Sequence, residues 1–145
     1  MRQPFAWMLL LVAGCSASPD EPTGDGSDVA PRLAGRRLSE SEVSTALRSA
    51  GFSASTIPAM VCAAKYESSF YTEALHKNHN GSIDYGLFQI NDVLWAGKCG
   101  LTVSGLYDPA KNAHCAKKVY DSGGLHSWYG YTKHQRECDA YSVSQ

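Results

Sequence analysis

The first 34 residues divide into an apolar run and a polar run. Arg2 precedes the apolar residues 5 to 13, which have the charged start and short hydrophobic segment of a secretory signal and are too short to span a bilayer comfortably. Residues 16 to 34 are rich in Ser, Pro, Gly and Asp and could build almost no core. We therefore predict a signal peptide over residues 1 to 15, a flexible tether over 16 to 34, and one folded domain over 35 to 145.

Helical spacing of apolar residues begins after the tether. Ser39 and Glu42 form the S-x-x-E pattern of a capping box, and Gly51 supplies a stop. A second helix is opened by Ser55 or Thr56. The apolar faces, at i, i+3, i+4 and i+7, are Val43, Ala46, Leu47 and Ala50 in the first helix and Ile57, Met60, Val61 and Ala64 in the second.

The helical period is lost between residues 76 and 91. Residues 76 to 85 predict two short strands around Asn80-Gly81, which is the strongest short-range signal of a hairpin. Residues 86 to 91 form a mostly apolar third segment that we expect to return under the sheet. The pattern therefore places a small antiparallel sheet after the first two helices.

A third helix and an aromatic segment follow. Asp108-Pro109 is typical of a helix start, and Gly123-Gly124 closes the helix. The inward face carries Asn112, Cys115, Ala116 and Val119. Residues 125 to 131 are rich in aromatic side chains, most of which we interpret as core.

Charge and composition exclude several classes of function. Residues 34 to 145 carry 11 of the 13 Lys and Arg and 10 of the 14 Asp and Glu, so their net charge is about +1. A charge this small predicts no strong electrostatic capture of nucleic acid or of an acidic cell wall. His76 and His79 have no Cys or carboxylate at matching spacing, so we interpret them as surface residues. We expect no nucleic-acid partner, no metal, no cofactor and a monomer.

Five cysteines leave one outside any set of disulfide pairs. Residues 11 to 15, LVAGC, resemble the bacterial lipobox, in which the cysteine is lipidated and becomes the first residue of the mature protein. We predict that Cys15 is lipidated in this way. Because Ser16 and not Asp follows it, we predict an anchor to the outer membrane, facing the periplasm or the exterior. The alternative is an ordinary signal cut near Ala17 or Ser18, which would discard Cys15 and give a secreted protein.

Two carboxylates carry the candidate chemistry. Glu67 lies one turn beyond the apolar face of the second helix, where the helix dipole and an apolar surround both raise the pKa of a carboxyl. Asp84 lies on a strand, and Asn78 and Ser82 are close enough on the hairpin to hydrogen-bond its carboxylate and keep it ionised. Taken singly, Glu67 is explained as a solvated charge and Asp84 as a strand-end acceptor. Jointly they predict the carboxylate pair of a glycoside hydrolase.

Residues 61 to 70, VCAAKYESSF, and 81 to 91, GSIDYGLFQIN, resemble the C-type lysozyme/α-lactalbumin family. The resemblance resumes at HCAKKVYDSGG, from residue 114, and at Trp128. It implies an α+β, lysozyme-like fold in which a helical domain and a small antiparallel β-sheet subdomain flank a cleft. It further implies a muramidase that hydrolyses the β-1,4 bond between N-acetylmuramic acid and N-acetylglucosamine in peptidoglycan.

The resemblance also assigns roles to residues. Glu67 would be the general acid, packed against Trp128, and Asp84 the nucleophile or stabiliser of a retaining hydrolysis. The implied contacts to peptidoglycan or a chitin-like oligosaccharide are Asn78, Gln89, Asn91, Trp95, Ser127 and Trp128. The implied disulfides are Cys62–Cys138 and Cys99–Cys115.

Departures from the family pattern lower the expected robustness and affinity. Family members usually have four disulfides, and each missing bridge costs ~2–5 kcal/mol in a small secreted domain. Leu94 stands where the family often has a second sugar-stacking Trp, so weaker substrate binding is expected. The acidic cluster that binds calcium in α-lactalbumin is not visible around residues 104 to 108, so we predict no calcium site.

Two other functions fit parts of the sequence. Glu-Ser-x-Phe followed by Gly-Leu-Phe-Gln also resembles the lytic transglycosylases, which cleave the same bond without water and generally work with one catalytic Glu. Asp84 argues against that class. A non-catalytic glycan-binding protein of the α-lactalbumin kind is the second alternative, and the retained carboxylate pair argues against it.

Overall fold

The computed structural model describes residues 32 to 144. The predicted signal peptide, Cys15 and most of the predicted tether lie outside the described residues. Arg32 and Ala34, at the end of the predicted tether, are hydrogen-bonded to the rest of the chain. The Arg32 backbone pairs with that of Leu75 through N–O distances of 2.8 and 2.9 Å, and the Ala34 carbonyl accepts from the Glu73 amide at 2.9 Å. Residues 32 to 34 thus belong to the folded part.

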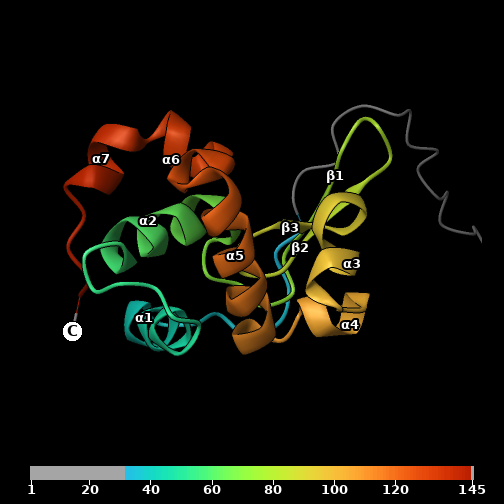
Figure 1. Ribbon diagram of the computed structural model, residues 1–145, viewed down its shortest axis with the longest axis horizontal. Helices are drawn as coiled ribbons and strands as arrows, with labels where there is room; N and C mark the ends of the chain where they lie inside the picture. Colours follow the sequence, from blue (N-terminus) through green and yellow to red (C-terminus); the bar gives the residue numbers. More distant parts are fainter. Residues whose placement is uncertain (1–31, 145) are drawn as a thin grey trace, which may run out of the picture.

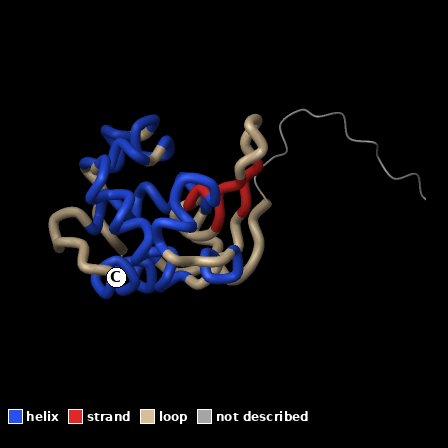
Figure 2. Tube along the Cα trace, turned by 45° about the vertical axis from the view of Figure 1, so that its right-hand side comes forward, coloured by secondary structure: helices blue, strands red, loops and turns tan. Residues whose placement is uncertain are grey.

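Most of the helices lie together on one side of the molecule, and a small sheet lies on the other side (Figures 1 and 2). The longer helices are α1 (Glu40–Ser49), α2 (Ile57–Ser68) and α5 (Pro109–Gly123), and the sheet contains β1 (Leu75–Lys77), β2 (Ile83–Tyr85) and β3 (Ile90–Asn91). The short helical elements are η1 (Asp92–Ala96), α3 (Gly97–Cys99), α4 (Val103–Leu106), η2 (Leu125–Ser127), α6 (Tyr129–Lys133) and α7 (Gln135–Asp139). The described part is therefore α+β, as the resemblance implied.

Helix α2 forms the centre of the helical side. All residues from 59 to 64 are buried, and the helix packs against α1, α6 and α7. The predicted capping box opens α1, because the Ser39 hydroxyl accepts from the Glu42 amide and the Glu42 carboxylate accepts from the Ser39 amide. The predicted opening of α2 is confirmed at Thr56. Thr56 is the N-cap residue, but its side chain makes no capping hydrogen bond; it pairs instead with the hydroxyl of Ser53 at 2.8 Å.

The sheet is antiparallel in the order β1-β2-β3. The predicted hairpin is present, with Lys77 opposite Ile83 and five residues between the two strands. The prediction that residues 86 to 91 pass under the sheet is wrong. Ile90 and Asn91 pair with β2 and so add a third strand, because the chain turns tightly at residues 86 to 89.

Asn112 ties α5 to the sheet side. Its side chain is fully buried, and its amide nitrogen donates to the carbonyls of Tyr85 at 2.9 Å and Leu106 at 2.7 Å. Its amide oxygen accepts from the Phe88 amide at 2.9 Å. Gly86 lies against this side chain, since a Cβ at Gly86 would come within 2.6 Å of the Asn112 nitrogen. These contacts fix the chain between β2 and β3 relative to the helical side.

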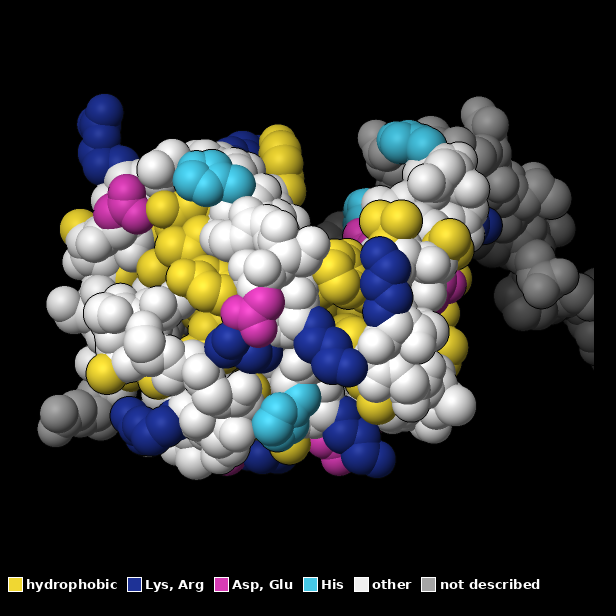
Figure 3. Space-filling model, viewed as in Figure 1, with side chains coloured by type: hydrophobic (Ala, Val, Ile, Leu, Met, Phe, Trp, Pro, Cys, Tyr) yellow, Lys and Arg dark blue, Asp and Glu magenta, His cyan; other side chains and the backbone are white. Residues whose placement is uncertain are grey.

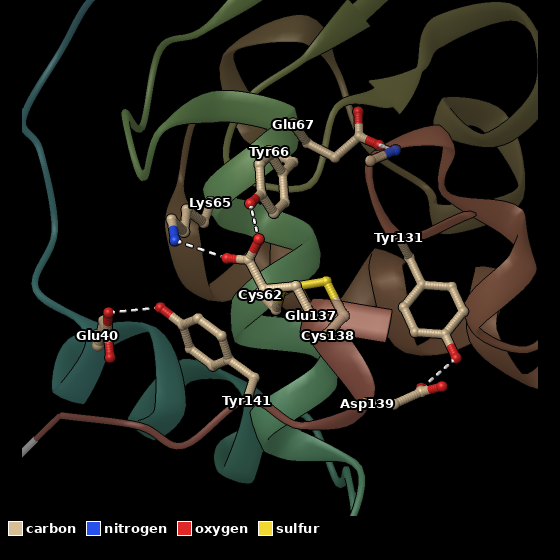
Figure 4. The surroundings of a disulfide bond; sticks show 11 residues. Glu40, Cys62, Lys65, Tyr66, Glu67, Tyr131, Glu137, Cys138, Asp139 and Tyr141 are labelled. Atoms are coloured by element: carbon tan, nitrogen blue, oxygen red, sulfur yellow. Dashed lines mark hydrogen bonds and ion pairs between the residues drawn. A yellow bond between two sulfur atoms is a disulfide. The ribbon is translucent and has the colours of Figure 1, made fainter. Parts of the chain in front are cut away.

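Two disulfides, Cys62–Cys138 and Cys99–Cys115, link segments that are distant in the sequence. They are the pairs that the family resemblance implied, and disulfides are typical of exported proteins. Beside Cys62–Cys138, polar contacts hold the C-terminal segment against α1 and α2 (Figure 4). The Tyr141 hydroxyl donates to Glu40 at 2.6 Å, and Lys65 pairs with Glu137 at 3.1 Å.

Within residues 32 to 144, no helix is long and apolar enough to cross a membrane.

Candidate active site

A cleft of about 560 Å³ lies between the helical side and the sheet side, and Figure 3 shows a notch in the surface there, with hydrophobic side chains on both of its edges. Glu67 and Asp84 both line this cleft. So do the six residues that the resemblance assigned to substrate binding, namely Asn78, Gln89, Asn91, Trp95, Ser127 and Trp128. The structure therefore brings every predicted cleft residue to one place.

Glu67 lies in the last turn of α2 and is half-buried. Burial raises the pKa of its carboxyl, and the charge of Asp84 raises it further. One interaction opposes these effects, because the Gly130 amide donates to Glu67 Oε1 at 2.7 Å. Figure 4 shows the Glu67 side chain directed at the backbone of α6, away from Tyr66 and the disulfide. The net result is a carboxyl whose pKa lies above its ordinary value of 4.5.

Asp84 lies in β2 and receives two side-chain hydrogen bonds. The Asn78 amide donates to Oδ2 at 3.0 Å, and the Asn91 amide donates to Oδ1 at 2.7 Å. The predicted bond from Ser82 is absent from this arrangement. The Ser82 hydroxyl donates to Asn80 at 2.8 Å and accepts from both of the amides that serve Asp84. Ser82 thus positions the two amides and does not contact the carboxylate through a hydrogen bond.

Two other cleft residues are held by contacts to the backbone. The Trp128 indole nitrogen donates to the Phe88 carbonyl at 3.0 Å, which fixes the ring in the wall of the cleft. Gln89 adopts a left-handed backbone conformation with φ of 47°, and its amide nitrogen donates to the Gly86 and Ala74 carbonyls. Sparsely populated backbone conformations of this kind cluster at functional sites.

Two features of the cleft were not predicted. Asn91 was predicted only to contact substrate, yet it makes the shorter of the two hydrogen bonds to Asp84. Nothing in the sequence indicated that Asn91 lies opposite Asp84 in the sheet. Most aromatic side chains of residues 125 to 131 were predicted to be core, and Trp128 and Tyr131 are buried. Tyr129, however, is exposed and lines the cleft. The sequence did not distinguish Tyr129 from the two buried aromatics near it, because a short irregular segment has no periodic pattern of buried and exposed residues.

Among residues 32 to 144, no three His, Cys, Asp or Glu side chains are grouped so that they could hold a metal ion.

Comparison with known proteins assigns the chain to a family. The sequence pattern of the C-type lysozyme/alpha-lactalbumin family matches residues 36 to 144. Lysozyme c-1 of Anopheles gambiae is 30% identical over 138 residues, covering 90% of this chain and 89% of that protein. A lysozyme of Galleria mellonella is 43% identical over 103 residues, covering 64% and 85%.

Solved structures agree with the sequence comparison. Recombinant canine milk lysozyme superposes with a TM-score of 0.62 at 33% identity, covering 70% of this chain and 90% of that one. A lysozyme from Litopenaeus vannamei superposes with a TM-score of 0.61 at 29% identity, covering 74% and 99%. The chain belongs to the C-type lysozyme/alpha-lactalbumin family and is a glycoside hydrolase of the lysozyme type.

Proposed function

We propose that this enzyme hydrolyses the β-1,4 bond between N-acetylmuramic acid and N-acetylglucosamine in peptidoglycan, with Glu67 as general acid and base and Asp84 as nucleophile or stabiliser. The observation that carries the proposal is the placement of two carboxyls with opposite surroundings in one cleft. Glu67 has a raised pKa, which keeps a proton available for the leaving oxygen. Asp84 accepts two amide hydrogen bonds, which stabilise a carboxylate.

The proposed reaction has two steps. In the first, protonated Glu67 gives its proton to the glycosidic oxygen while Asp84 attacks or stabilises the cationic sugar carbon. In the second, the Glu67 carboxylate takes a proton from water, whose oxygen attacks the same carbon and releases the sugar with retained configuration. The Gly130 amide bonds the Glu67 carboxyl at Oε1, and we assign it the task of holding that group in place through both steps.

The other cleft residues divide into positioning and contact roles. The side-chain amides of Asn78 and Asn91 donate to Asp84, and the Trp128 indole nitrogen donates to the Phe88 carbonyl. We assign these three to positioning and to the apolar wall. Trp95 presents an indole for contact with a sugar ring, and the backbone near Ser127 offers polar groups to the glycan. Gln89 shapes the cleft floor through its two carbonyl contacts.

Product analysis on purified peptidoglycan tests the proposal. Mass spectrometry of the digest should show free reducing ends on N-acetylmuramic acid, and proton NMR taken early in the reaction should show the β-anomer first. Abundant 1,6-anhydro ends would instead establish a lytic transglycosylase. Equal turbidity clearance of bacterial walls by the wild type, Glu67→Gln and Asp84→Asn would contradict catalysis by these two carboxyls.

The proposed location rests on the sequence at Cys15. A lipid on this residue would hold the enzyme at the outer membrane through the tether. Metabolic labelling with a fatty-acid analogue should mark the wild type and leave Cys15→Ala unlabelled. A mature N-terminus beyond Cys15 would show that the protein is secreted without an anchor.

A further inference from the structure

Tyr129 is an aromatic residue of the cleft that the proposed mechanism does not use. Its side chain is 73% exposed, whereas Trp128 and Tyr131 on either side are 4% and 3% exposed. It nevertheless lines the same cleft as Glu67 and Trp95. A singly exposed aromatic on an ordinary surface needs no explanation. One at the edge of a glycan cleft offers a flat apolar face where a sugar ring would lie.

The backbone that carries Tyr129 also holds the general acid. The next residue, Gly130, donates its amide hydrogen to Glu67 Oε1 at 2.7 Å. The Tyr129 carbonyl accepts from the Thr132 hydroxyl at 2.9 Å, and the Trp128 carbonyl accepts from the Thr132 amide at 3.1 Å. The start of α6 is thereby fixed on both sides of Tyr129. The backbone of Tyr129 is consequently held beside the amide that bonds the Glu67 carboxyl.

The opposite edge of the cleft is poorer in aromatic surface. Leu94 is 59% exposed there and offers no ring. Beside it, Trp95 has the Lys98 ammonium 4.5 Å from its ring centroid, so a cation already contacts this ring. Tyr129 has a weaker contact of the same kind, with the Lys133 ammonium 5.7 Å from its centroid, and remains mostly exposed. The helical edge therefore offers the more accessible aromatic face.

We propose that Tyr129 is a stacking platform for the sugar on the leaving-group side of the bond that is cut. This inference rests on the proposed function. Glu67 gives its proton to the oxygen of the departing sugar, and α6, which carries Tyr129, also supplies the amide that bonds the Glu67 carboxyl. Sugar rings have apolar C–H faces that pack on aromatic rings, and the tyrosine hydroxyl adds a polar contact at the wet edge.

Transglycosylation reports on the leaving-group side. In this side reaction the hydroxyl of an acceptor sugar replaces water, passes its proton to the Glu67 carboxylate and forms the new bond to the sugar carbon held by Asp84. The acceptor occupies the position that the departing sugar has left. A platform for that sugar therefore favours transglycosylation relative to hydrolysis.

The test uses the wild type, Tyr129→Ala, Tyr129→Phe and Val103→Ala with a hexamer of N-acetylglucosamine. Tyr129→Ala should lower both kcat/KM and the ratio of transglycosylation to hydrolysis by about threefold to tenfold. Tyr129→Phe should keep most of both, because the ring remains. Val103 is also exposed but lies outside the lining of the cleft, so Val103→Ala should match the wild type. An unchanged ratio in Tyr129→Ala would overturn the inference.

A binding measurement separates this inference from the proposed function. Calorimetry with the same hexamer compares Glu67→Gln with the double variant Glu67→Gln/Tyr129→Ala, so that no turnover intervenes. The double variant should bind about threefold to tenfold more weakly. Equal affinities would contradict the platform. Absence of hydrolysis by the wild type would instead count against the proposed function alone.

Discussion

Glu67 and Asp84 line one cleft, yet the two regions that hold them treat a carboxyl in opposite ways. Glu67 ends a buried helix and receives one backbone hydrogen bond, from Gly130. Asp84 lies on a strand of a small sheet and receives two side-chain hydrogen bonds, from Asn78 and Asn91. The helical region withholds water and so raises the pKa of Glu67. Surroundings, and not residue type, therefore make one carboxyl the acid and the other the anion.

Glu67→Gln removes the proton donor and gives the largest expected effect. Activity on bacterial walls should fall by about 10²–10⁴-fold, the usual contribution of general acid catalysis. Folding should survive, because an amide can still accept from the Gly130 amide. Turbidity clearance measures the loss, and circular dichroism checks the fold.

The same variant tests the cost of the buried carboxylate. The folded state raises the pKa of Glu67, so the folded state binds more protons than the unfolded state. Ionisation of Glu67 therefore lowers the free energy of unfolding as the pH rises from 4.5 through the folded-state pKa. Glu67→Gln should melt at or above the wild-type temperature at pH 7, with the difference vanishing below about pH 4. A lower melting temperature at pH 7 would show that the carboxylate is stabilised.

Asp84→Asn removes the anion and keeps the size of the side chain. We expect an activity loss of about 100-fold, smaller than that of Glu67→Gln, because electrostatic stabilisation is lost while the acid remains. The charge of Asp84 also raises the pKa of Glu67. The alkaline limb of the pH–activity profile should consequently move to lower pH in this variant.

Gly130→Ala disturbs the position of the Glu67 carboxyl and leaves both carboxyl groups chemically unchanged. A Cβ at this position would lie 2.8 Å from the Tyr66 Cβ and 3.0 Å from Glu67 Oε1, so the carboxyl must shift. We expect about a 10- to 100-fold loss of kcat, since small misplacements at a reacting centre are costly. Gly97→Ala is the matched control, because nothing lies within 4 Å of a Cβ there. Equal activity of the two variants would show that the amide contact is dispensable.

Asn78→Ala weakens the other side of the comparison and gives the smallest effect. It removes one of two donors to Asp84 and leaves Asn91 in place. A hydrogen bond to a charged group is worth about 1.5–3 kcal/mol, and the lower end applies because Asn91 still donates to Asp84, so kcat/KM should fall by about tenfold. His76→Ala on the neighbouring strand is the control for hairpin structure, as His76 does not line the cleft. A loss as large as that of Asp84→Asn would mean that the hairpin had unfolded.

Much of the fold could be predicted from local chemistry. The capping box of Ser39 and Glu42 and the cap at Asp108 act over three residues, and the structure has both. The carboxylate pair could also be predicted, because Glu67 follows the apolar face of a helix and Asp84 follows a hairpin turn. Thr56 opens α2 as the local pattern predicts, although its hydroxyl pairs with that of Ser53 and makes no capping bond to the helix.

The remainder depends on contacts between distant segments. Asn91 reaches Asp84 only because β3 pairs with β2, and Ser82 is drawn to Asn80 by the shape of the hairpin loop. The exposure of Tyr129 follows from how α6 sits on α2, a packing that no periodicity encodes. The contact between Tyr141 and Glu40 spans 101 residues and is equally invisible in the sequence.

The helical region raises the pKa of the Glu67 carboxyl, so this group stays protonated at a higher pH than an ordinary glutamate. Carbon-13 NMR of the side-chain carboxyl, assigned by comparison with Glu67→Gln, measures this directly in the free enzyme. We predict a titration midpoint above 4.5 in the wild type and a lower midpoint in Asp84→Asn. A wild-type midpoint at or below 4.5 would contradict the assignment of Glu67 as the acid.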